Sequence, residues 1–296
     1  MKIIFFCNWG ENSENLLNRY KKLTYNNYGI YKNIIGVSNI DVADYIIFLE
    51  GIPNHYNLNF LLKKKVICFP REPNIQTKNW EKFKLRYGFT YDNFYHVVTN
   101  PEFINKDYDF LKKLEYQDSE NILSTVMSNK INGEGYKLRY NFLVKFSREY
   151  PGICDIYGHG WKNELGTSYK GELDCYHNKN NQKNKTKFDA LINYKYSICI
   201  ENCEKKNYFS EKFTDAILCW TIPIYYGCLN ISDYFPENSY YYIDIKNKNI
   251  NQCIKNIIEK PINEDNIAAL KKARNLILYK YNIWNSIHDT IFKKNI

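Results

Sequence analysis

The sequence predicts an α/β protein with two domains, each built around a parallel β-sheet. Its 296 residues suffice for two such domains with separate cores. Hydrophobic residues make up 44% of the chain and aromatic residues 17%, as expected of a folded, globular protein. Strand-like segments also alternate with helix-like segments along the chain. We place the domains at residues 1–115 and 116–262, and a C-terminal helical segment at 263–296.

The first domain begins with the strand-like segment "KIIFFC" (2–7), which the helix-like "SENLLNRYKKL" (13–23) follows. Three further strand-like segments are "DYIIFL" (44–49), "KKVICF" (64–69) and "FYHVVT" (94–99). This alternation predicts parallel strands joined by crossover helices.

A second set of α/β segments begins near Asn121. The helix-like segment at 136–150 carries an apolar stripe of Leu138, Phe142, Leu143 and Phe146. The tail predicts two helices that could pack back on the first domain. The remaining segments are the strands "NILSTVM" (121–127), "ICDIYG" (153–158) and "SYYYIDI" (239–245), and the helices 267–281 and 283–292.

The charge of the chain favours an anionic partner. It carries 41 basic and 32 acidic side chains, a net charge of +9, which suits a phosphate ester. An arginine-rich arm, zinc-finger spacing and an aromatic RNA-binding signature are all missing, so we expect no nucleic-acid partner. Solvated surface lysines explain the same charge without any ligand.

The cysteines and the N-terminal residues indicate the cellular compartment in which the protein is expected. Nine cysteines without a CxxC pair predict free thiols in a reducing compartment. The first apolar run ends at Asn8 without a cleavage site, and no run approaches the ~20 apolar residues of a membrane span. We expect a soluble, cytoplasmic protein without a transmembrane segment, and leave open a peripheral membrane contact of the basic C-terminal helices.

The segment from Tyr194 to Gly227 predicts a βαβ unit. Residues 194–200 alternate as in a strand that ends at Glu201. Ser210 is a candidate N-cap for a helix that presents one apolar face. The segment "TIPIYYG" then predicts a short buried strand, with Pro223 limiting its hydrogen-bond ladder. The apolar face of the helix comprises Phe213, Ala216, Ile217 and Trp220.

Ligands of such units bind beyond the carboxyl ends of the strands, where helix N-termini favour anions. Asn202, Tyr208, Glu211 and Lys212 would converge there. The helix dipole disfavours a lysine in the first turn, and a bound anion would relieve this conflict. A carboxylate nearby could accept hydrogen bonds from a ribose diol, so the pattern suits a nucleoside diphosphate. An ordinary capped surface helix with an exposed Glu–Lys pair fits the same residues.

The whole stretch, "YKYSICIENCEKKNYFSEKFTDAILCWTIPIYYG", resembles the hallmark segment of the α1,3/4-fucosyltransferases, glycosyltransferase family 10. That family carries a strand ending in Glu-Asn, a tyrosine six residues after the Asn, a Thr/Ser-Glu-Lys and an Ile-Pro-Ile-Tyr-Trp-Gly. The resemblance implies a GT-B fold, in which two Rossmann-like domains hold a nucleotide-sugar cleft between them. The counterparts here are Glu201, Asn202, Tyr208, Ser210, Glu211, Lys212 and "IPIYYG".

The resemblance also implies donor-binding residues. Arg139, in "YKLRYNFLVKFSREY", resembles the diphosphate-binding arginine, although it also suits the surface of an amphipathic helix. Tyr157 and Gly158 would form the floor near the nucleotide. The residues of the hallmark segment that would bind GDP-fucose are Asn202, Tyr208, Glu211 and Lys212.

The general base implied by the resemblance is Glu72, in "KKKVICFPREPN". Arg71 or Glu50 would take this place if the alignment slips, and Glu72 would then be a bystander. The implied reaction is inverting transfer of L-fucose from GDP-β-L-fucose to a glycan hydroxyl, the 3-OH or 4-OH of an N-acetylglucosamine or glucose unit. The family requires no cofactor, and a divalent metal is not essential.

Some features depart from the family or suggest rivals. Phe-Glu-Asn is Ile-Glu-Asn here, and Tyr-Trp-Gly is Tyr-Tyr-Gly. The polar segment 177–187 is interpreted as a solvated, mobile insertion, with an acceptor-binding loop as the alternative. Asp107 and Asp109 form a DxD, which we interpret as coincidental. Two rival functions are a GT-B transferase for another sugar nucleotide and a non-catalytic nucleotide-sugar or glycan-binding protein.

Overall fold

The structure of the chain is a computed structural model, and its contacts divide the chain into two compact units. The first unit comprises residues 1–98, 107–112 and 279–296, and the second comprises residues 99–106 and 113–278. The residues that the structure describes are 1–7, 9–49, 64–69, 90–91, 104, 106–174 and 185–292.

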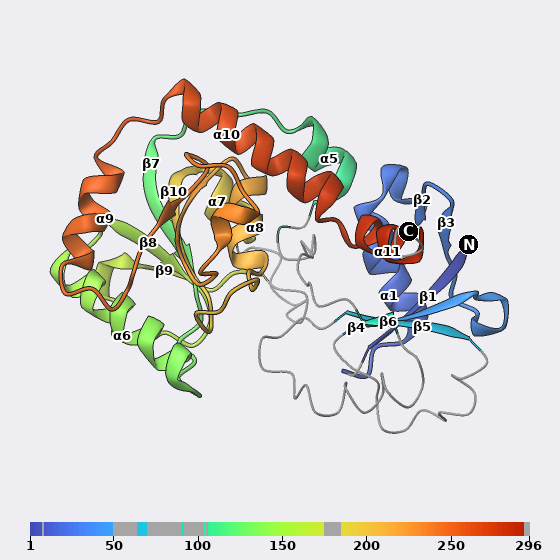
Figure 1. The fold of residues 1–296 in the computed structure, drawn as a ribbon. Coiled ribbons are helices and arrows are strands. Elements are labelled where there is room, and N and C mark those ends of the chain that lie inside the picture. Colours follow the sequence, from blue (N-terminus) through green and yellow to red (C-terminus); the bar gives the residue numbers. More distant parts are fainter. Residues whose placement is uncertain are drawn as a thin grey trace. The chain divides into compact units, whose positions relative to one another are not determined.

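A six-stranded sheet with the order β2-β3-β1-β4-β5-β6 forms the centre of the first unit (Figure 1). Its neighbouring strands run parallel, except that β2 and β3 form an antiparallel pair. The strands β1 and β4 are buried along nearly their whole length, since helices cover a parallel sheet. The strand bounds are β1 Lys2–Cys7, β2 Ile30–Tyr31, β3 Ile34–Gly36, β4 Tyr45–Leu49, β5 Lys65–Phe69 and β6 Thr90–Tyr91.

Two helices far apart in the sequence complete the core of the first unit. Helix α1 (Ser13–Tyr20) begins at the N-cap Asn12, whose side chain accepts from the backbone N–H of Asn15, and it buries Leu16 and Tyr20. Helix α11 (Ile283–Phe292) adds Trp284, which is fully buried and donates its indole N–H to the carbonyl of Tyr20 (2.8 Å). Helix α11 therefore belongs to the core of the first unit.

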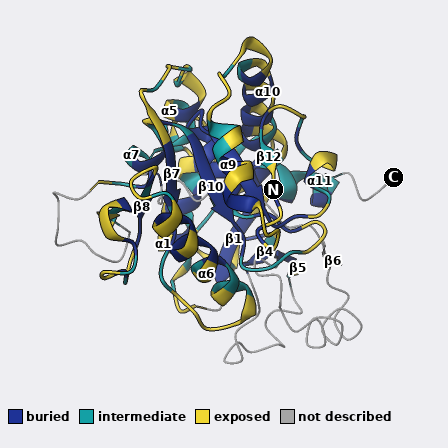
Figure 2. Ribbon diagram, turned by 90° about the vertical axis from the view of Figure 1, so that its left-hand side faces the viewer, coloured by how far each residue is buried: buried dark blue, intermediate teal, exposed yellow. Residues whose placement is uncertain are grey.

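The second unit contains a six-stranded parallel sheet with the order β12-β11-β10-β7-β8-β9. Strand β10 occupies a central position, and six of its seven residues are buried (Figure 2). Helices on both faces explain why its polar Ser197 is as buried as its apolar residues. The strand bounds are β7 Asn121–Val126, β8 Cys154–Tyr157, β9 Tyr169–Gly171, β10 Tyr194–Ile200, β11 Ile222–Tyr226 and β12 Tyr241–Tyr242.

The helices of the second unit lie on both faces of its sheet, with α7 and α8 on one side and α6 and α9 on the other (Figure 1). Helix α10 packs against α8. A π-helical turn, Leu276–Lys280, follows α10 and leads toward α11. The helix bounds are α5 Tyr108–Lys113, α6 Glu134–Glu149, α7 Asp189–Ile192, α8 Glu211–Leu218, α9 Ile250–Ile258 and α10 Glu264–Asn275.

Most of the predicted elements are present, and the two Rossmann-like sheets of the predicted fold class are confirmed. The expected helix at 210–220 ends earlier, at Leu218, because Trp220 adopts a left-handed backbone conformation (φ 62°). The expected strand at 239–245 is reduced to β12. The segment "FYHVVT" lies outside the described residues. The expected C-terminal segment 263–296 is divided, since α10 lies in the second unit and α11 in the first.

The polar segment 177–187 differs from the prediction at its end. Lys187 was expected to be solvated, but only 9% of its surface is exposed. Its ammonium group is buried because Asp215 on α8 pairs with it at 2.8 Å. Residues 175–184 lie outside the described part of the chain, so the interpretation of the remainder of the segment stays a prediction.

Eight cysteines within the described residues are free thiols, as predicted, and six of them are buried. In the described part of the chain, no helix combines the length and the apolar character needed to cross a membrane.

Candidate functional site

The junction of β10 and α8 brings the predicted polar residues to the carboxyl edge of the second sheet. Strand β10 ends at Ile200, and Glu201 and Asn202 follow it directly. The side chain of Ser210 caps α8 by accepting from the backbone N–H of Lys212 (3.3 Å), so the predicted N-cap is correct. A strand end and a helix start therefore meet at one place, as a βαβ unit requires.

The carboxylate of Glu201 is buried at the centre of this junction, with 1% of the residue exposed. Its Oε1 accepts hydrogen bonds from the backbone N–H (2.7 Å) and the hydroxyl (2.9 Å) of Ser210. Burial raises the pKa of Glu201, which the ammonium group of Lys212 opposes. Glu201 belongs to the hallmark segment of the sequence but was not among the predicted donor-binding residues. An acid directly after a buried strand is the signal that could have revealed its role.

The side chain of Lys212 lies among oxygen atoms. Its Nζ is 3.1 Å from the hydroxyl of Ser210, 3.5 Å from Oε2 of Glu201 and 3.4 Å from Oε1 of Glu211. The helix dipole disfavours a cation in the first turn, and the two carboxylates offset this effect. The alternative of an exposed Glu–Lys pair is thus only partly correct, because a third, buried partner is present.

Helix α6 delivers Arg139 to the same junction. Arg139 is 4% exposed, and its Nη1 donates to Oδ1 of Asn202 at 2.7 Å. The guanidinium group also lies over the ring of Tyr136, 4.5 Å from its centre, and Asn202 donates to the hydroxyl of Tyr136 (3.0 Å). The surface position that the sequence allowed for Arg139 is therefore wrong.

The electrostatic surroundings of Arg139 show which side chains share this site. Burial lowers the pKa of Arg139, and Tyr136, Glu201, Glu211 and Tyr208 act in the opposite direction. The Nε of Arg139 is buried and has no hydrogen-bond partner among the described residues. A buried guanidinium N–H without an acceptor is costly, and an anionic ligand would supply the acceptor.

A glycine permits the close approach of α6 to the end of β10. A Cβ atom added at Gly135 would lie 1.6 Å from the backbone oxygen of Asn202. Only glycine lets the first turn of α6 come this near to a neighbouring backbone. Gly135 was not among the predicted residues, because its role depends on a contact that is distant in sequence.

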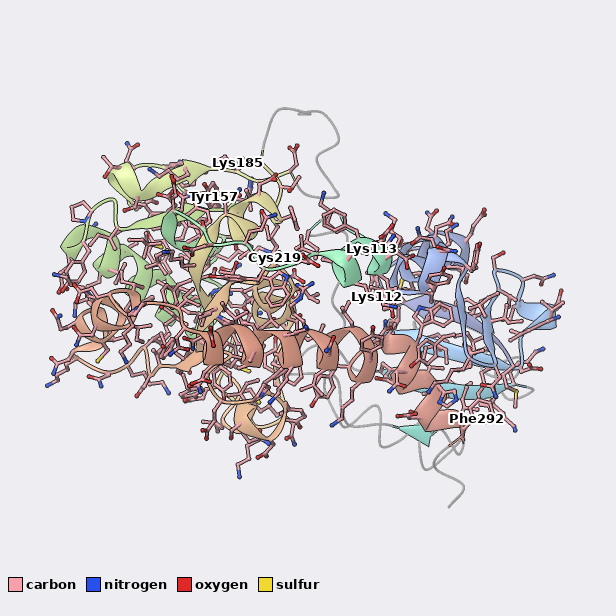
Figure 3. The ribbon with its side chains drawn as sticks, turned by 90° about the horizontal axis from the view of Figure 1, so that it is seen from above. Lys112, Lys113, Tyr157, Lys185, Cys219 and Phe292 are labelled. Carbon is pink, nitrogen blue, oxygen red and sulfur yellow. The ribbon has the colours of Figure 1, made fainter. Side chains whose placement is uncertain are left out.

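Tyr157 and Gly158 form a separate group at the end of β8. Tyr157 is buried, and its hydroxyl is 2.8 Å from that of Tyr194 and accepts from Nζ of Lys185 (3.3 Å; Figure 3). Gly158 has a φ of 140°, and a Cβ there would lie 2.1 Å from the carbonyl oxygen of Met127. Both residues shape the edge of the sheet, and their contact with a nucleotide stays a prediction.

Two predicted features remain, the general base and the DxD. Glu72, with its alternatives Arg71 and Glu50, falls outside the described residues. The two aspartates of the DxD belong to the start of α5. Asp107 accepts from the backbone N–H of Phe110 (2.9 Å), and Asp109 accepts from the backbone N–H of Asn26 (2.6 Å). These bonds show capping and loop-fixing roles for the DxD, which was expected to lie in a linker.

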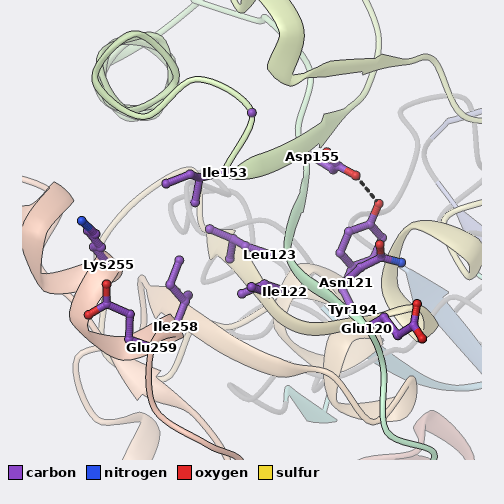
Figure 4. A pocket seen from close by; sticks show the side chains of 11 residues that line it. Glu120, Asn121, Ile122, Leu123, Ile153, Asp155, Tyr194, Lys255, Ile258 and Glu259 are labelled. Atoms are coloured by element: carbon purple, nitrogen blue, oxygen red, sulfur yellow. Dashed lines mark hydrogen bonds between the residues drawn. The ribbon is translucent and has the colours of Figure 1, made fainter.

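A hollow of about 710 Å³ lies at the opposite, amino-terminal edge of the second sheet, where β7, β8 and β10 begin (Figure 4). Ile122, Leu123, Ile153 and Ile258 form its apolar part, and charged side chains lie around them. Asp155 within this hollow accepts from the hydroxyl of Tyr194 (2.7 Å). None of the predicted donor-binding residues lines this hollow.

Within the described ranges, no group of three or more His, Cys, Asp or Glu side chains is arranged to hold a metal ion. The predicted independence of a divalent metal remains a prediction, because this finding concerns protein ligands alone.

Comparison with known proteins places the junction within a matched segment. Residues 127–261 match the family model described as glycosyltransferase family 10 (fucosyltransferase) C-term. An alpha-(1,3)-fucosyltransferase of Helicobacter pylori is 40% identical over 68 residues, or 23% of this chain and 14% of that protein. An alpha-(1,4)-fucosyltransferase of Arabidopsis thaliana is 36% identical over 50 residues, or 17% of this chain and 12% of that protein. The matched segments thus span less than a fifth of the curated relatives.

A solved structure of an α1,3-fucosyltransferase covers 95% of this chain and 82% of that chain, with 17% identity and a TM-score of 0.48.

Proposed function

We propose that this chain, whose residues 127–261 match the model of glycosyltransferase family 10 (fucosyltransferase), transfers L-fucose from GDP-β-L-fucose to a glycan hydroxyl. The acceptor group is the 3-OH or 4-OH of an N-acetylglucosamine or glucose unit. The matched relatives carry both α1,3 and α1,4 names, so the sequence match leaves both positions within the proposal.

The observation that carries the proposal is the meeting of Arg139, Asn202 and Lys212 at the carboxyl edge of the second sheet. Arg139 bonds Asn202 directly, and the carboxylates of Glu201 and Glu211, which lie near Lys212, also act on Arg139. Two cations beside the N-terminus of α8 suit the diphosphate of the donor. The buried Nε of Arg139 leaves one donor for a phosphate oxygen.

In the proposed reaction a general base removes the proton from the acceptor hydroxyl, and the oxygen attacks the anomeric carbon of fucose. The bond from that carbon to the β-phosphate oxygen breaks, and GDP leaves with the electron pair. Arg139 and Lys212 stabilise the negative charge that grows on the diphosphate.

We assign the base to Glu72 from the family resemblance. General-base assistance contributes about 10² to 10⁴ in rate, so Glu72→Gln should lower kcat within this range and leave GDP affinity nearly unchanged. A variant that retains over half of the wild-type kcat would remove Glu72 from this role.

The test is incubation with GDP-fucose and a panel of lactosamine-type and simpler glycans, followed by mass spectrometry of the products. A fucosylated product with GDP release supports the proposal, and fragmentation of the product identifies the linkage. A parallel thermal-shift panel of GDP-, UDP- and TDP-sugars tests the donor, because only a ligand that binds the folded chain raises Tm. Stabilisation by a UDP- or TDP-sugar alone would favour another transferase. GDP-fucose binding without any product would favour a non-catalytic binding protein.

A further inference from the structure

Lys187 precedes α7 and lies beside α8. Its Nζ is 2.8 Å from Oδ2 of Asp215 and 3.4 Å from the carbonyl oxygen of Glu211. Lys187 therefore contacts α8 at two positions one turn apart, and that turn carries Lys212. Lys187 and Lys212 also line the same small cavity, together with the carboxyl ends of β7 and β10.

The pair of Lys187 and Asp215 is buried. Asp215 is fully buried and Lys187 is 9% exposed. The second oxygen of Asp215, Oδ1, has no hydrogen-bond partner among the described residues. Burying two charges costs several kcal/mol per ion, and replacing such a pair by apolar residues is often neutral or stabilising. A buried pair is thus weak evidence for stability alone, and its position beside Lys212 suggests another use.

We propose that Lys187 is a positioning residue of the donor site, which fixes the first turn of α8 through Asp215 and Glu211 and so holds Lys212 and Glu211 in place for the diphosphate and the ribose. The proposal rests on the proposed function for the identity of the ligand. The fixed geometry follows from the contacts of Lys187, whatever nucleotide binds.

The experiment uses the full chain and isothermal calorimetry with GDP. Removing Lys187 alone would leave a buried, unpaired carboxylate and could unfold the chain. The decisive variant is therefore the double change Lys187→Met and Asp215→Leu, which removes both charges together. We expect this variant to fold, with a urea midpoint near that of the wild type. It should bind GDP about tenfold more weakly, because a displaced Lys212 loses much of its charge-assisted contact with the diphosphate.

A matched control is the double change Lys195→Met and Asp118→Leu. This pair is also a Lys–Asp pair of the same unit, with its atoms 3.5 Å apart, but it is largely exposed, with 32% and 70% of the side chains accessible. It should leave GDP affinity within twofold of the wild type, since exposed pairs contribute little. A folded Lys187 and Asp215 double variant with wild-type GDP affinity would overturn the proposal. A wild-type chain that binds no GDP would contradict the proposed function instead.

The dependence of GDP affinity on pH separates positioning from a purely structural role. Burial raises the pKa of Asp215 to about 6, which Lys187 opposes. The other ionisable groups around Asp215 are Glu211 and Lys212 on α8, Cys199 on β10 and Cys219 after α8; Arg274 and Asp189 act on Cys219.

Lowering the pH from about 7.5 to about 5.5 protonates Asp215 in the wild type and removes the partner of Lys187. The double variant Lys187→Met and Asp215→Leu lacks this titrating pair and is the reference, because the titration of GDP itself affects both proteins equally. Wild-type GDP affinity should therefore fall more steeply over this interval than that of the double variant. Parallel pH curves for the two proteins would overturn the positioning role.

Discussion

A single buried carboxylate, that of Glu201, holds together the residues at the end of β10 and the start of α8. It bonds the backbone N–H and the hydroxyl of Ser210 and lies 3.5 Å from Nζ of Lys212. A Cβ on Gly227 would lie 2.4 Å from Cγ of Glu201, so this glycine leaves the space that the glutamate occupies. The motif residues Glu201, Ser210 and Gly227 thus belong to one packed unit.

Replacing Ser210 by alanine should destabilise the chain. The change removes the cap of α8, which typically contributes 0.5–2 kcal/mol, or about 1 kcal/mol on average. It also deprives the buried carboxylate of Glu201 of a hydroxyl donor, which adds about 1–3 kcal/mol. Urea unfolding should report a loss of roughly 2–4 kcal/mol. Ser210→Thr, which keeps the hydroxyl, is the control. If Ser210→Ala loses no more unfolding free energy than Ser210→Thr does, the role of this hydroxyl is contradicted.

The variant Lys212→Ala tests the donor site at one atom. A hydrogen bond to a charged group contributes about 1.5–3 kcal/mol, so the loss of the ammonium group should weaken GDP binding by roughly ten- to a hundredfold. Calorimetry measures this change. Lys145→Ala, on the exposed side of α6, should bind GDP like the wild type. Unchanged affinity in Lys212→Ala would mean that the phosphates bind elsewhere.

At the scale of residues, the sequence predicts what depends on neighbours along the chain. The cap Ser210 follows from local pattern, and the positions of Asn202 and Lys212 follow from where a strand ends and a helix begins. The contacts of Glu201 and Lys187 depend on which segments the fold brings together, and local pattern does not contain this information. Lys187, in a run of polar residues, has the local signature of a solvated loop, and only Asp215 makes it a buried residue.

At the scale of elements, β1, β4, β5, β7, β8 and β10 agree closely with the predicted strands, because short runs of β-branched and aromatic residues mark them. Strand β12 is shorter than predicted, since it pairs with β11 only through Ile224 and Tyr225. Pro223, which was expected to limit the ladder, lies just outside this pairing. The burial of β10 on both faces exceeds what its alternating pattern indicates, because central strands receive helices on both sides.

Replacing Gly135 by alanine should displace helix α6. In Gly135→Ala the new methyl group meets the backbone of Asn202, so α6 must move away and carry Arg139 with it. Overpacking of this kind costs about 1–3 kcal/mol, and a displaced Arg139 should weaken GDP binding about tenfold. Urea unfolding and calorimetry measure the two effects. Lys137→Ala, exposed on the same helix, should change neither. A Gly135→Ala protein with wild-type values in both would show that α6 tolerates the shift.

At the scale of the whole molecule, the chain forms two units with parallel sheets, as the alternation of segments predicts. What the sequence could not supply is the assignment of the last helices, α10 and α11, because an apolar face does not reveal which of the two cores it joins. The large side chains of α11 pack into the core of the first unit. Trp284 packs edge-on against Phe5 with ring centres 5.6 Å apart, and Ile283, Ile287 and Ile291 join the same core.

Trp284→Ala should therefore destabilise the first unit, although the residue is nearly 280 positions away from β1 in sequence. Losing a fully buried tryptophan costs about 3–5 kcal/mol, and the indole bond to Tyr20 is lost as well. Chemical denaturation monitored by hydrogen exchange of β1 and β4 would measure this loss. Val42→Ala, at a position that is 45% exposed, should stay within about 0.5 kcal/mol of the wild type. Equal protection in both variants would show that α11 is dispensable for this core.

The position of α11 also has a consequence for the order in which the protein is made. The first unit contains both β1 and α11, so the ribosome synthesises nearly the whole second unit before the first can close its core. The second unit consists largely of one continuous stretch and can fold during synthesis, whereas the first must keep its strands partly uncovered until α11 arrives. Contacts between distant segments form slowly, and uncovered strands aggregate. The first unit is therefore where we expect chaperones to bind the nascent chain.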